Sequence, residues 1–496
     1  MNFSHLELKK IFKERRVQLA FVIVISFLLR LYRVDNPVLD WHAFRQADTA
    51  SVTYRYTLEG VNLLYPKYHD LSNIQSGLDN PEGYRMVEFP LINGFIAIIL
   101  RALPEADLVI TSRFISILAS TGTMIFLYWF IKQILSHQLA LLSVIFFGLM
   151  PFSIFYSRVI LPEPFMLMFS TASMAFFAAY YLPKNLKDRK KVFWWLSIIC
   201  LALSLLIKPF VLFLAPVYVY ILWLHQPHFL KNMRTYLYPI LAIIPLILWR
   251  RWIQNFPEGI PASQWLFNSD GIRLRPAWFR WLFWERLTIL IGGFIGPILA
   301  LPNILKKNKG LMLLASWWTG LILYLIVIAT GNVRHDYYQV LLIPCVALTF
   351  ARGVQILQQI LFNKLESKRI SFSQQISWAT ISLLTLTMIL LSWNQVKGYF
   401  NVNHWEYLHA GEEVRQLIEA DAKIIAPAMG DTMFLFQTRR NGWPIGYNIK
   451  DKIEAGATHY VSTTYDDEAR ELESKYLTVK KTNEFILIDL TKSRPQ

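Results

Sequence analysis

Long apolar runs recur along this chain of 496 residues, and they constrain its fold more than any other feature. Runs of about 18–20 residues match the length that an α-helix needs to cross roughly 30 Å of hydrocarbon. Charged residues make up 17 % of the chain, against about 25 % in soluble domains. The sequence therefore predicts an all-α polytopic membrane protein with about eleven spans, near 17–34, 108–134, 138–156, 162–182, 193–208, 210–225, 235–250, 286–304, 311–330, 338–360 and 376–394.

The formal net charge of +16 comes from Lys and Arg residues in short loops between the apolar runs. In such loops basic residues fix the orientation of a membrane protein, because they are retained in the cytoplasm. With the spans above, all of the basic clusters fall on one side. We therefore expect no nucleic-acid partner and a cytoplasmic N-terminus, from the clusters at 9–16, 183–192, 231–234, 306–309 and 364–369.

The opposite side receives the longer segments. Segment 35–107 is too long to be a connector of about 4–6 residues, and it contains a helical pattern at 90–103. We expect that helix to lie at the membrane interface. We predict a transmembrane domain over 1–394, with the active site in loop 35–107, and a small extracytoplasmic α/β domain over 395–496. Its expected helices are 410–420 and 466–476, and its expected strands are 423–427, 459–463 and 485–490.

Several function classes lack their sequence signals. The two cysteines, Cys200 and Cys345, lie inside predicted spans, so neither a disulfide framework nor a thiolate metal site is predicted. The chain has no phosphate-binding loop of the ATPase type and no nucleotide-sugar fingerprint. If the protein is a transferase, a donor carried in the membrane fits it better than a cytosolic nucleotide sugar.

Acidic and basic side chains gather at the start of the first long loop. In a helix, Arg45, Asp48 and Thr49 share one face because of their three- and four-residue spacing. A carboxylate held there can take a proton from an acceptor hydroxyl or amine, as a general base does. The alternative is an Arg45–Asp48 surface pair of little energetic consequence.

Two further acids precede helical patterns that begin with proline. Glu88 comes before Pro90, and Glu163 lies between Pro162 and Pro164. Either acid can simply stabilise a helix N-terminus. In a site with other acids, Glu88 is a candidate ligand for a divalent metal, and Glu163 is a candidate second catalytic carboxylate.

Cations follow at the same side of the membrane. Lys208 lies at the end of a span, and Arg334 and His335 lie in a short turn. These side chains can extend to the lipid headgroups, and His335 can be a structural interface residue. The alternative is binding of a phosphate or pyrophosphate, for which the arginine side chain is well shaped.

These motifs, in their order along the chain, resemble the membrane glycosyltransferases of the GT-C fold, specifically the bacterial glycosyltransferase family 39 group. That group includes protein O-mannosyltransferases and the aminoarabinose transferases that modify lipid A. The resemblance covers most of the chain. It rests on His42-Ala-Phe-Arg45-Gln46-Ala-Asp48-Thr49-Ala50, Glu88-Phe89-Pro90, Tyr156-Ser157-Arg158 through Leu161-Pro162-Glu163, Lys208-Pro209 and His335-Asp336-Tyr337-Tyr338.

The resemblance implies an inverting transfer of a sugar from a polyprenyl-phosphate donor to an acceptor outside the cytoplasm. It implies an acid of the first loop as base and, in some members, a divalent ion such as Mg²⁺, Mn²⁺ or Zn²⁺ near the site. On this basis the candidate catalytic residues are Asp48, Asp40 and Glu163, and Glu88 is the candidate metal ligand. The candidate residues for the donor phosphate are His42, Arg45, Lys208, Arg334, His335 and Tyr337.

Two departures from the family pattern bear on these roles. Phe89 replaces a lysine that contacts phosphate in the family, so phosphate binding must come from elsewhere, with Arg45, Lys208 and Arg334 as candidates. Many members begin the loop with an Asp-Glu pair, where this chain has Arg45-Gln46. We therefore expect Asp48 to be the base, with Asp40 as the second choice.

Three other interpretations remain open from the sequence, and one of them is a non-catalytic member of the family that binds a lipid-linked sugar. A transporter or flippase of polyprenyl-linked glycans also carries charged residues in its spans, often with internal repeats, and no repeat is apparent here. A polysaccharide polymerase or ligase would share the lipid donor. The sequence does not distinguish the sugar or the acceptor, because those depend on the shape of the pocket.

Overall fold

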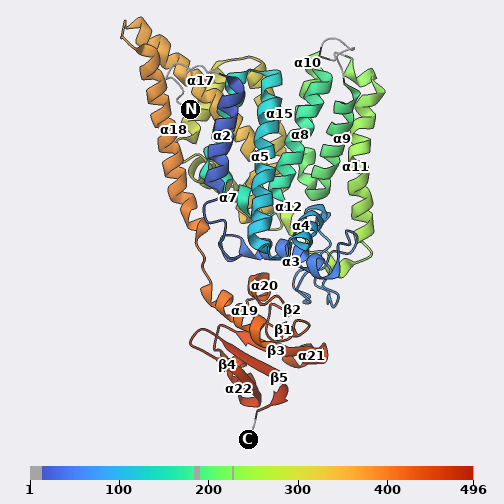
Figure 1. Ribbon diagram of the computed structural model, residues 1–496. Helices are drawn as coiled ribbons and strands as arrows, with labels where there is room; N and C mark the ends of the chain where they lie inside the picture. The colour runs from blue at the N-terminus through green and yellow to red at the C-terminus, as the bar shows by residue number, and fades with distance from the viewer. Residues whose placement is uncertain (1–13, 184–189, 226–227, 495–496) are drawn as a thin grey trace, which may run out of the picture. The chain divides into compact units, whose positions relative to one another are not determined.

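The computed structural model describes residues 14–183, 190–225 and 228–494 (Figure 1). The predicted basic clusters at 9–13 and 184–189 lie outside these residues. The chain divides into two compact units. The helical unit comprises residues 1–32, 116–248 and 263–398, and the loop–tail unit comprises residues 33–115, 249–262 and 399–496. The predicted functional boundary at residue 394 stays a prediction.

Among the described residues, five helical stretches are long and apolar enough to cross a membrane, or seven if each of two bent helix pairs is one span. Three shorter apolar helices accompany them. This number is roughly consistent with the predicted eleven, and the first long helix has the predicted bounds. The five stretches are α5 (Leu108–Ile134), α11 (Met233–Ile253), α15 (Lys309–Val327), η7 with α17 (Asp336–Leu342, Ile343–Ser367) and α18 through α19 (Ser373–Val396, Trp405–Leu417).

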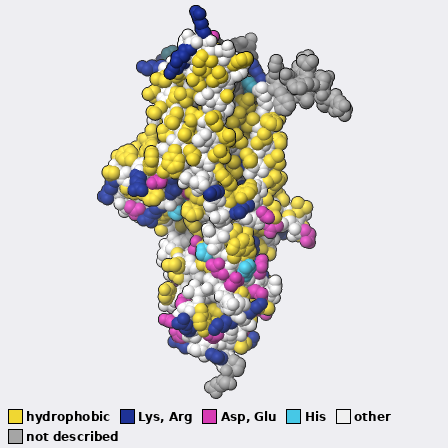
Figure 2. Space-filling view, turned by 90° about the vertical axis from the view of Figure 1, so that its left-hand side faces the viewer, with side chains coloured by type: hydrophobic (Ala, Val, Ile, Leu, Met, Phe, Trp, Pro, Cys, Tyr) yellow, Lys and Arg dark blue, Asp and Glu magenta, His cyan; other side chains and the backbone are white. Residues whose placement is uncertain are grey.

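The other helices of this unit also follow predicted spans. Helix α8 packs against α9 and α10, and α2 packs against the helix that follows α5. Large apolar side chains such as Phe21, Leu28 and Ile247 are more than half exposed, and Figure 2 shows hydrophobic side chains over the surface of the helices. Exposed side chains of this kind are suited to contact with lipid. The bounds are α2 (Arg15–Arg30), α8 (Glu163–Tyr181), α9 (Lys191–Ile207), η2 (Pro209–Leu214) and α10 (Ala215–His225).

Two predicted spans are bent rather than straight. Helices α6 (His137–Leu149) and α7 (Pro151–Arg158) meet at 69°, because Pro151 has no N–H to continue the helix. The second bend, of 93°, separates Pro276–Ile291 from Gly296–Leu305. There Gly293 has φ of 49°, and a Cβ atom would lie 2.2 Å from the carbonyl oxygen of Met388. Glycine adopts this backbone conformation without strain, and a residue with a Cβ atom has no room at this close approach.

The loop–tail unit combines two helices of the first loop with the C-terminal sheet domain. Helix α4 (Leu91–Ala102) is the helix expected at 90–103, and it packs against α3 (Ala43–Glu59). The sheet has five strands in the order β2-β1-β3-β5-β4. Strand β1 (Lys423–Ile425) is parallel to β2 (Asn441–Trp443) and β3 (Ala457–Ser462), and β5 (Ile486–Ser493) is antiparallel to β3 and β4 (Tyr476–Lys481).

Alternating residues of these strands fill two separate cores, as the period of two in a β-strand requires. Ile424 faces the core beneath α19 and α20 (Thr432–Thr438), and Ile425 faces the core beneath α22 (Asp467–Lys475). The α/β character, strands β1, β3 and β5 and helix α22 follow the prediction. The sequence analysis did not identify α20, β2, β4 or α21 (Ile449–Glu454), which are short or mostly polar.

Candidate functional site

Helix α3 carries the predicted acid of the first loop. His42 precedes the helix with φ of 56°, and Gly60 ends it with φ of 93°, a conformation that glycine adopts readily. Along the helix, Arg45, Gln46 and Asp48 are all buried within the loop–tail unit. Polar side chains in such a position need partners, because an unpaired buried charge is costly.

Asp48 obtains those partners from both parts of the loop–tail unit. Its Oδ2 atom lies 2.7 Å from a guanidinium nitrogen of Arg85 and accepts a hydrogen bond of 3.3 Å from the Gln75 side chain. Its Oδ1 atom accepts a hydrogen bond of 2.7 Å from the Thr432 hydroxyl, at the start of α20. The arginine forms an ion pair with Asp48, whereas the threonine is a neutral donor that a substrate hydroxyl can replace.

Asp40, the second candidate base, is held differently. Its Oδ2 atom lies 3.2 Å from Arg113, and both side chains are fully buried. Its Oδ1 atom accepts a hydrogen bond of 2.7 Å from Gln46. A buried charge pair of this kind fixes the start of the loop against α5.

Arg45 and Glu88 form an ion pair that is largely buried. Each of the two side chains neutralises the charge of the other, which reduces the cost of burying them. Among residues 14–183, 190–225 and 228–494, no three His, Cys, Asp or Glu side chains cluster so that they could hold a metal ion. Glu88 with its arginine partner is a poor fit to a metal site, since cations prefer several oxygen ligands.

In the helical unit, Glu163 lies at the first position of α8 and Lys208 follows the end of α9. Their Oε1 and Nζ atoms are 3.3 Å apart, and both side chains are at most 10 % exposed. The Oε2 atom of Glu163 is buried without a hydrogen-bond partner among the described residues. Lys208 is therefore a buried cation beside a carboxylate, rather than a side chain extended to headgroups.

Arg334 and His335 lie directly before the long stretch formed by η7 and α17. Arg334 makes two hydrogen bonds to Asp270, of 2.7 and 3.1 Å, and its side chain is 54 % exposed. The ring of His335 stacks on that of Tyr337, with centroids 5.4 Å apart. Next to them, buried Asp336 accepts a hydrogen bond from Tyr156 and lies 3.7 Å from Arg286.

Sequence reasoning identified the acids but missed most of their partners. Arg85, Gln75 and Thr432 hold Asp48, and Arg113 holds Asp40. Each partner is far from its acid in the sequence and belongs to no motif. Pairing at such a distance depends on the tertiary fold, so no local pattern could have indicated it.

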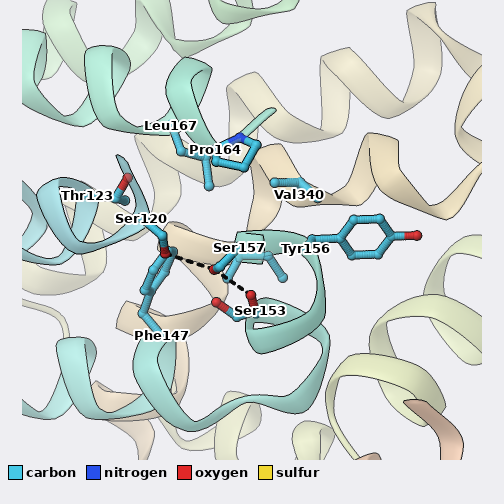
Figure 3. Close-up of a pocket in the computed structure, with 10 residues that line it drawn as sticks. Ser120, Thr123, Phe147, Ser153, Tyr156, Ser157, Pro164, Leu167 and Val340 are labelled. Carbon is cyan, nitrogen blue, oxygen red and sulfur yellow. Dashed lines mark hydrogen bonds between the residues drawn. The ribbon is translucent and has the colours of Figure 1, made fainter. Parts of the chain in front are cut away.

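A cluster of hydroxyl groups lies inside the helical unit, around a cavity of about 10 Å³ (Figure 3). Ser157 accepts a hydrogen bond of 2.8 Å from Ser120 and donates one to the carbonyl of Ser153. Arg30, which is fully buried, donates to Ser120 and Ser153 and to the carbonyls of residues 147 and 148. No Asp or Glu pairs with Arg30 in the described part of the chain. The guanidinium therefore donates hydrogen bonds to the carbonyl groups at the C-terminal end of α6, where the helix is interrupted.

Close to Asp48, the same unit contains a carboxyl group that titrates near neutral pH. Burial, with a smaller contribution from Asp48, raises the pKa of Asp70 to about 7. The Asp70 side chain accepts hydrogen bonds from the backbone of Ser72 and from the hydroxyl of Tyr68. Arg85 forms an ion pair with Asp48, whereas Asp70 forms no ion pair among the described residues.

We expect the stability of the protein to fall as pH rises from about 4 to 7, because of Asp70. In this range the folded state keeps a proton that the unfolded chain, with a pKa of about 3.9, has lost. The slope for one group is at most about 1.4 kcal/mol per pH unit. Asp70→Asn should flatten the dependence of the thermal midpoint on pH, and exposed Asp79→Asn should not. Equal slopes in all three proteins would contradict this assignment.

Comparisons with known proteins agree with this fold. The family model described as dolichyl-phosphate-mannose-protein mannosyltransferase matches residues 20–254. No curated protein sequence matches the chain significantly. The structure is similar to that of ArnT from Cupriavidus metallidurans bound to undecaprenyl phosphate, with a TM-score of 0.65, 9 % identity, and coverage of 96 % of this chain and 99 % of that chain.

The structure is also similar to an archaeal oligosaccharyltransferase, AglB from Archaeoglobus fulgidus. In complex with an inhibitory peptide and a dolichol-phosphate, that protein gives a TM-score of 0.56 at 10 % identity, covering 94 % of this chain and 74 % of that chain. Its complex with Zn and sulfate gives 0.55 at 11 %, covering 89 % and 68 %. The predicted GT-C fold is confirmed: the chain is a multi-pass membrane protein with the fold of ArnT and AglB, and its residues 20–254 resemble the dolichyl-phosphate-mannose-protein mannosyltransferases.

Proposed function

We propose that the protein is an inverting transferase that moves a sugar from a polyprenyl-phosphate donor to an extracytoplasmic acceptor. The donor class is supported by the lipid phosphates bound to ArnT and AglB and by the matching mannosyltransferase family. The observation that carries the reaction is Asp48, a buried carboxylate with one oxygen paired to Arg85 and the other on a neutral hydroxyl donor. It lies on the first-loop helix, where the reaction needs a base.

In the proposed reaction, the acceptor oxygen attacks the anomeric carbon from the side opposite the phosphate. The bond from that carbon to the phosphate oxygen breaks, and the lipid phosphate leaves. Asp48 takes the acceptor proton, and this requires the acceptor hydroxyl to replace Thr432 at Oδ1. Each acid has one oxygen on an arginine and the other on a neutral donor, which is Thr432 at Asp48 and Gln46 at Asp40. Asp48 is favoured as the base, because Arg113 and Gln46 around Asp40 are completely buried, whereas Arg85 and Thr432 are 8 % and 6 % exposed.

The proposed phosphate-binding residues are His42 and Arg45 in the loop–tail unit and Lys208, Arg334, His335 and Tyr337 in the helical unit. Lys208 has the most direct support, because it is a buried cation at the end of α9. Glu163, the third candidate acid, forms an ion pair with Lys208, and its second carboxylate oxygen has no hydrogen-bond partner among the described residues. We propose no metal-dependent step, since Glu88 is paired with Arg45.

The proposed location is the inner membrane of a bacterium, with the loop–tail unit outside the cytoplasm. This orientation rests on the shared side of the basic loops. It would give the loop–tail unit access to acceptors of the cell envelope. Labelling of Lys423 and Lys450, which are partly or fully exposed, by an impermeant reagent on intact spheroplasts tests it.

The test of function is transfer by the purified protein in lipid nanodiscs. Radiolabelled polyprenyl-phosphate hexoses and pentoses serve as donors, and an envelope membrane extract serves as acceptor. We expect label to move to the extract with release of lipid phosphate. A chelator arm, with Mg²⁺, Mn²⁺ or Zn²⁺ added back, tests a metal requirement. Movement of labelled lipid across a bilayer without transfer would favour the transporter alternative, and lengthening of the donor glycan would favour a polymerase.

A further inference from the structure

The loop–tail unit contains a cavity of about 590 Å³ that none of the proposed catalytic residues lines. One wall is the segment from Leu71 to Pro81 of the first loop, and the other is the tail around Lys423 and from Trp443 to Ala455. Sites for small molecules in proteins occupy about 300–1,000 Å³ and combine apolar or aromatic walls with a few polar groups. The volume and the lining are therefore those of a ligand site.

The two walls are fixed to each other by backbone hydrogen bonds. The Leu71 N–H donates to the carbonyl of Gly442 over 2.8 Å, and the Gly442 N–H donates to the carbonyl of His69 over 2.9 Å. Residue 70 thereby pairs in parallel with Gly442 and extends the edge of the sheet beyond β2. The two walls of the cavity are therefore held at a fixed distance by the sheet.

Tyr447 is an aromatic residue in the lining of this cavity. The side chain is 75 % exposed, while φ is 61° at Tyr447 and 48° at Asn448. The backbone here is held by Glu468, which accepts from the Tyr447 N–H over 2.6 Å, and by Lys452, which donates to the carbonyls of residues 446 and 447. The left-handed backbone conformation is unfavourable for tyrosine, and strained residues of this kind are concentrated at ligand-binding and active sites. The fold thus fixes an aromatic ring in an exposed position.

The polar groups of the cavity are balanced in charge. Two acids, Asp79 and Asp451, face two bases, Lys423 and Lys452. Both lysines already donate to backbone carbonyls, Lys423 to residue 455 over 3.0 Å. Neither acid forms an ion pair within the described residues. The charges of the four side chains cancel, so the cavity has no net charge. Its carboxylates can accept hydrogen bonds, and its aromatic residues provide an apolar surface. These properties suit a neutral ligand with many hydroxyl groups.

We propose that this cavity binds a saccharide unit of the acceptor, with Tyr447 stacked on the sugar face and Asp79 and Asp451 accepting hydroxyl hydrogen bonds. This inference rests on the proposed function, and it makes the acceptor class a glycan or glycolipid. Trp443, which is 8 % exposed, forms an apolar part of the wall. An amphipathic ring with few rotatable bonds loses little entropy when it contacts a ligand.

The test measures how the rate of transfer depends on acceptor concentration, with the full-length protein in nanodiscs and an envelope glycolipid extract. Tyr447→Ala should raise the half-saturating acceptor concentration about five- to ten-fold, as expected for loss of one aromatic stacking contact. The half-saturating donor concentration and kcat should stay near wild type. Tyr447→Phe keeps the ring and should bind as wild type. Tyr465→Ala, an exposed tyrosine outside the cavity, is the matched control.

An unchanged acceptor dependence in Tyr447→Ala, with transfer intact, would overturn the saccharide site and leave the proposed function standing. If wild type transfers no sugar from any donor, the proposed function fails first. The cavity is then tested directly by equilibrium dialysis with tritiated oligosaccharides released from the same extract. Saturable binding that is lost in Tyr447→Ala supports the site, and no binding to wild type overturns it.

Discussion

Asp48→Asn should reduce sugar transfer by roughly 10²–10⁴-fold, the usual contribution of a general base. The asparagine can still accept the hydrogen bond from Thr432, so the local shape is preserved, but it cannot take the acceptor proton. The measurement is the rate of transfer from labelled donor at saturating acceptor. Asp40→Asn, at the buried pair with Arg113, should lower stability more than the rate per folded molecule. The reverse order would make Asp40 the base.

A second variant separates catalysis from stability. Asp48→Asn leaves Arg85 as a buried charge without its partner, and breaking a buried pair costs about 3–5 kcal/mol. The double variant Asp48→Asn with Arg85→Gln removes the unpaired charge and should recover part of the thermal midpoint. Transfer should stay low in both variants. Recovery of activity together with stability would mean that Asp48 is only structural.

Arg30→Met should destabilise the helical unit by roughly 2–5 kcal/mol, because a hydrogen bond to a charged group contributes about 1.5–3 kcal/mol and the abandoned carbonyl keeps its desolvation cost. The carbonyl of Phe147 would normally accept from residue 151, which is a proline without an N–H. Arg30 donates to it over 3.3 Å and to the carbonyl of Gly148 over 2.9 Å. The measurement is the thermal midpoint in detergent.

The control for this prediction lies on the same helix. Arg16 is exposed in the first turn of α2, so Arg16→Met should change the midpoint little. Arg30→Lys keeps the charge but has fewer directed donors, and it should give an intermediate loss. An Arg30→Met protein as stable as wild type would show that water or lipid satisfies the broken end of α6 equally well.

Much of the helical architecture could be predicted, because the bilayer imposes one simple requirement on each span. An apolar run of sufficient length is enough to identify a helix such as α5, whose bounds agree with the prediction. The breaks were harder to place. Pro151 is visible in the sequence, but the bend at Gly293 depends on the close approach of Met388, which is distant in the chain.

The sequence by itself determined the class of protein, the helical spans and the acids of the first loop, because these depend on composition, period and local motif. The tertiary structure alone decided which partners each acid meets, since Arg85 approaches Asp48 when the first loop folds on itself and Thr432 approaches it when the tail packs on the loop. It also decided the cavity at Tyr447, whose two walls come from opposite ends of the sequence. Contacts of this kind are formed by packing over the whole unit, and no local pattern of residues encodes them.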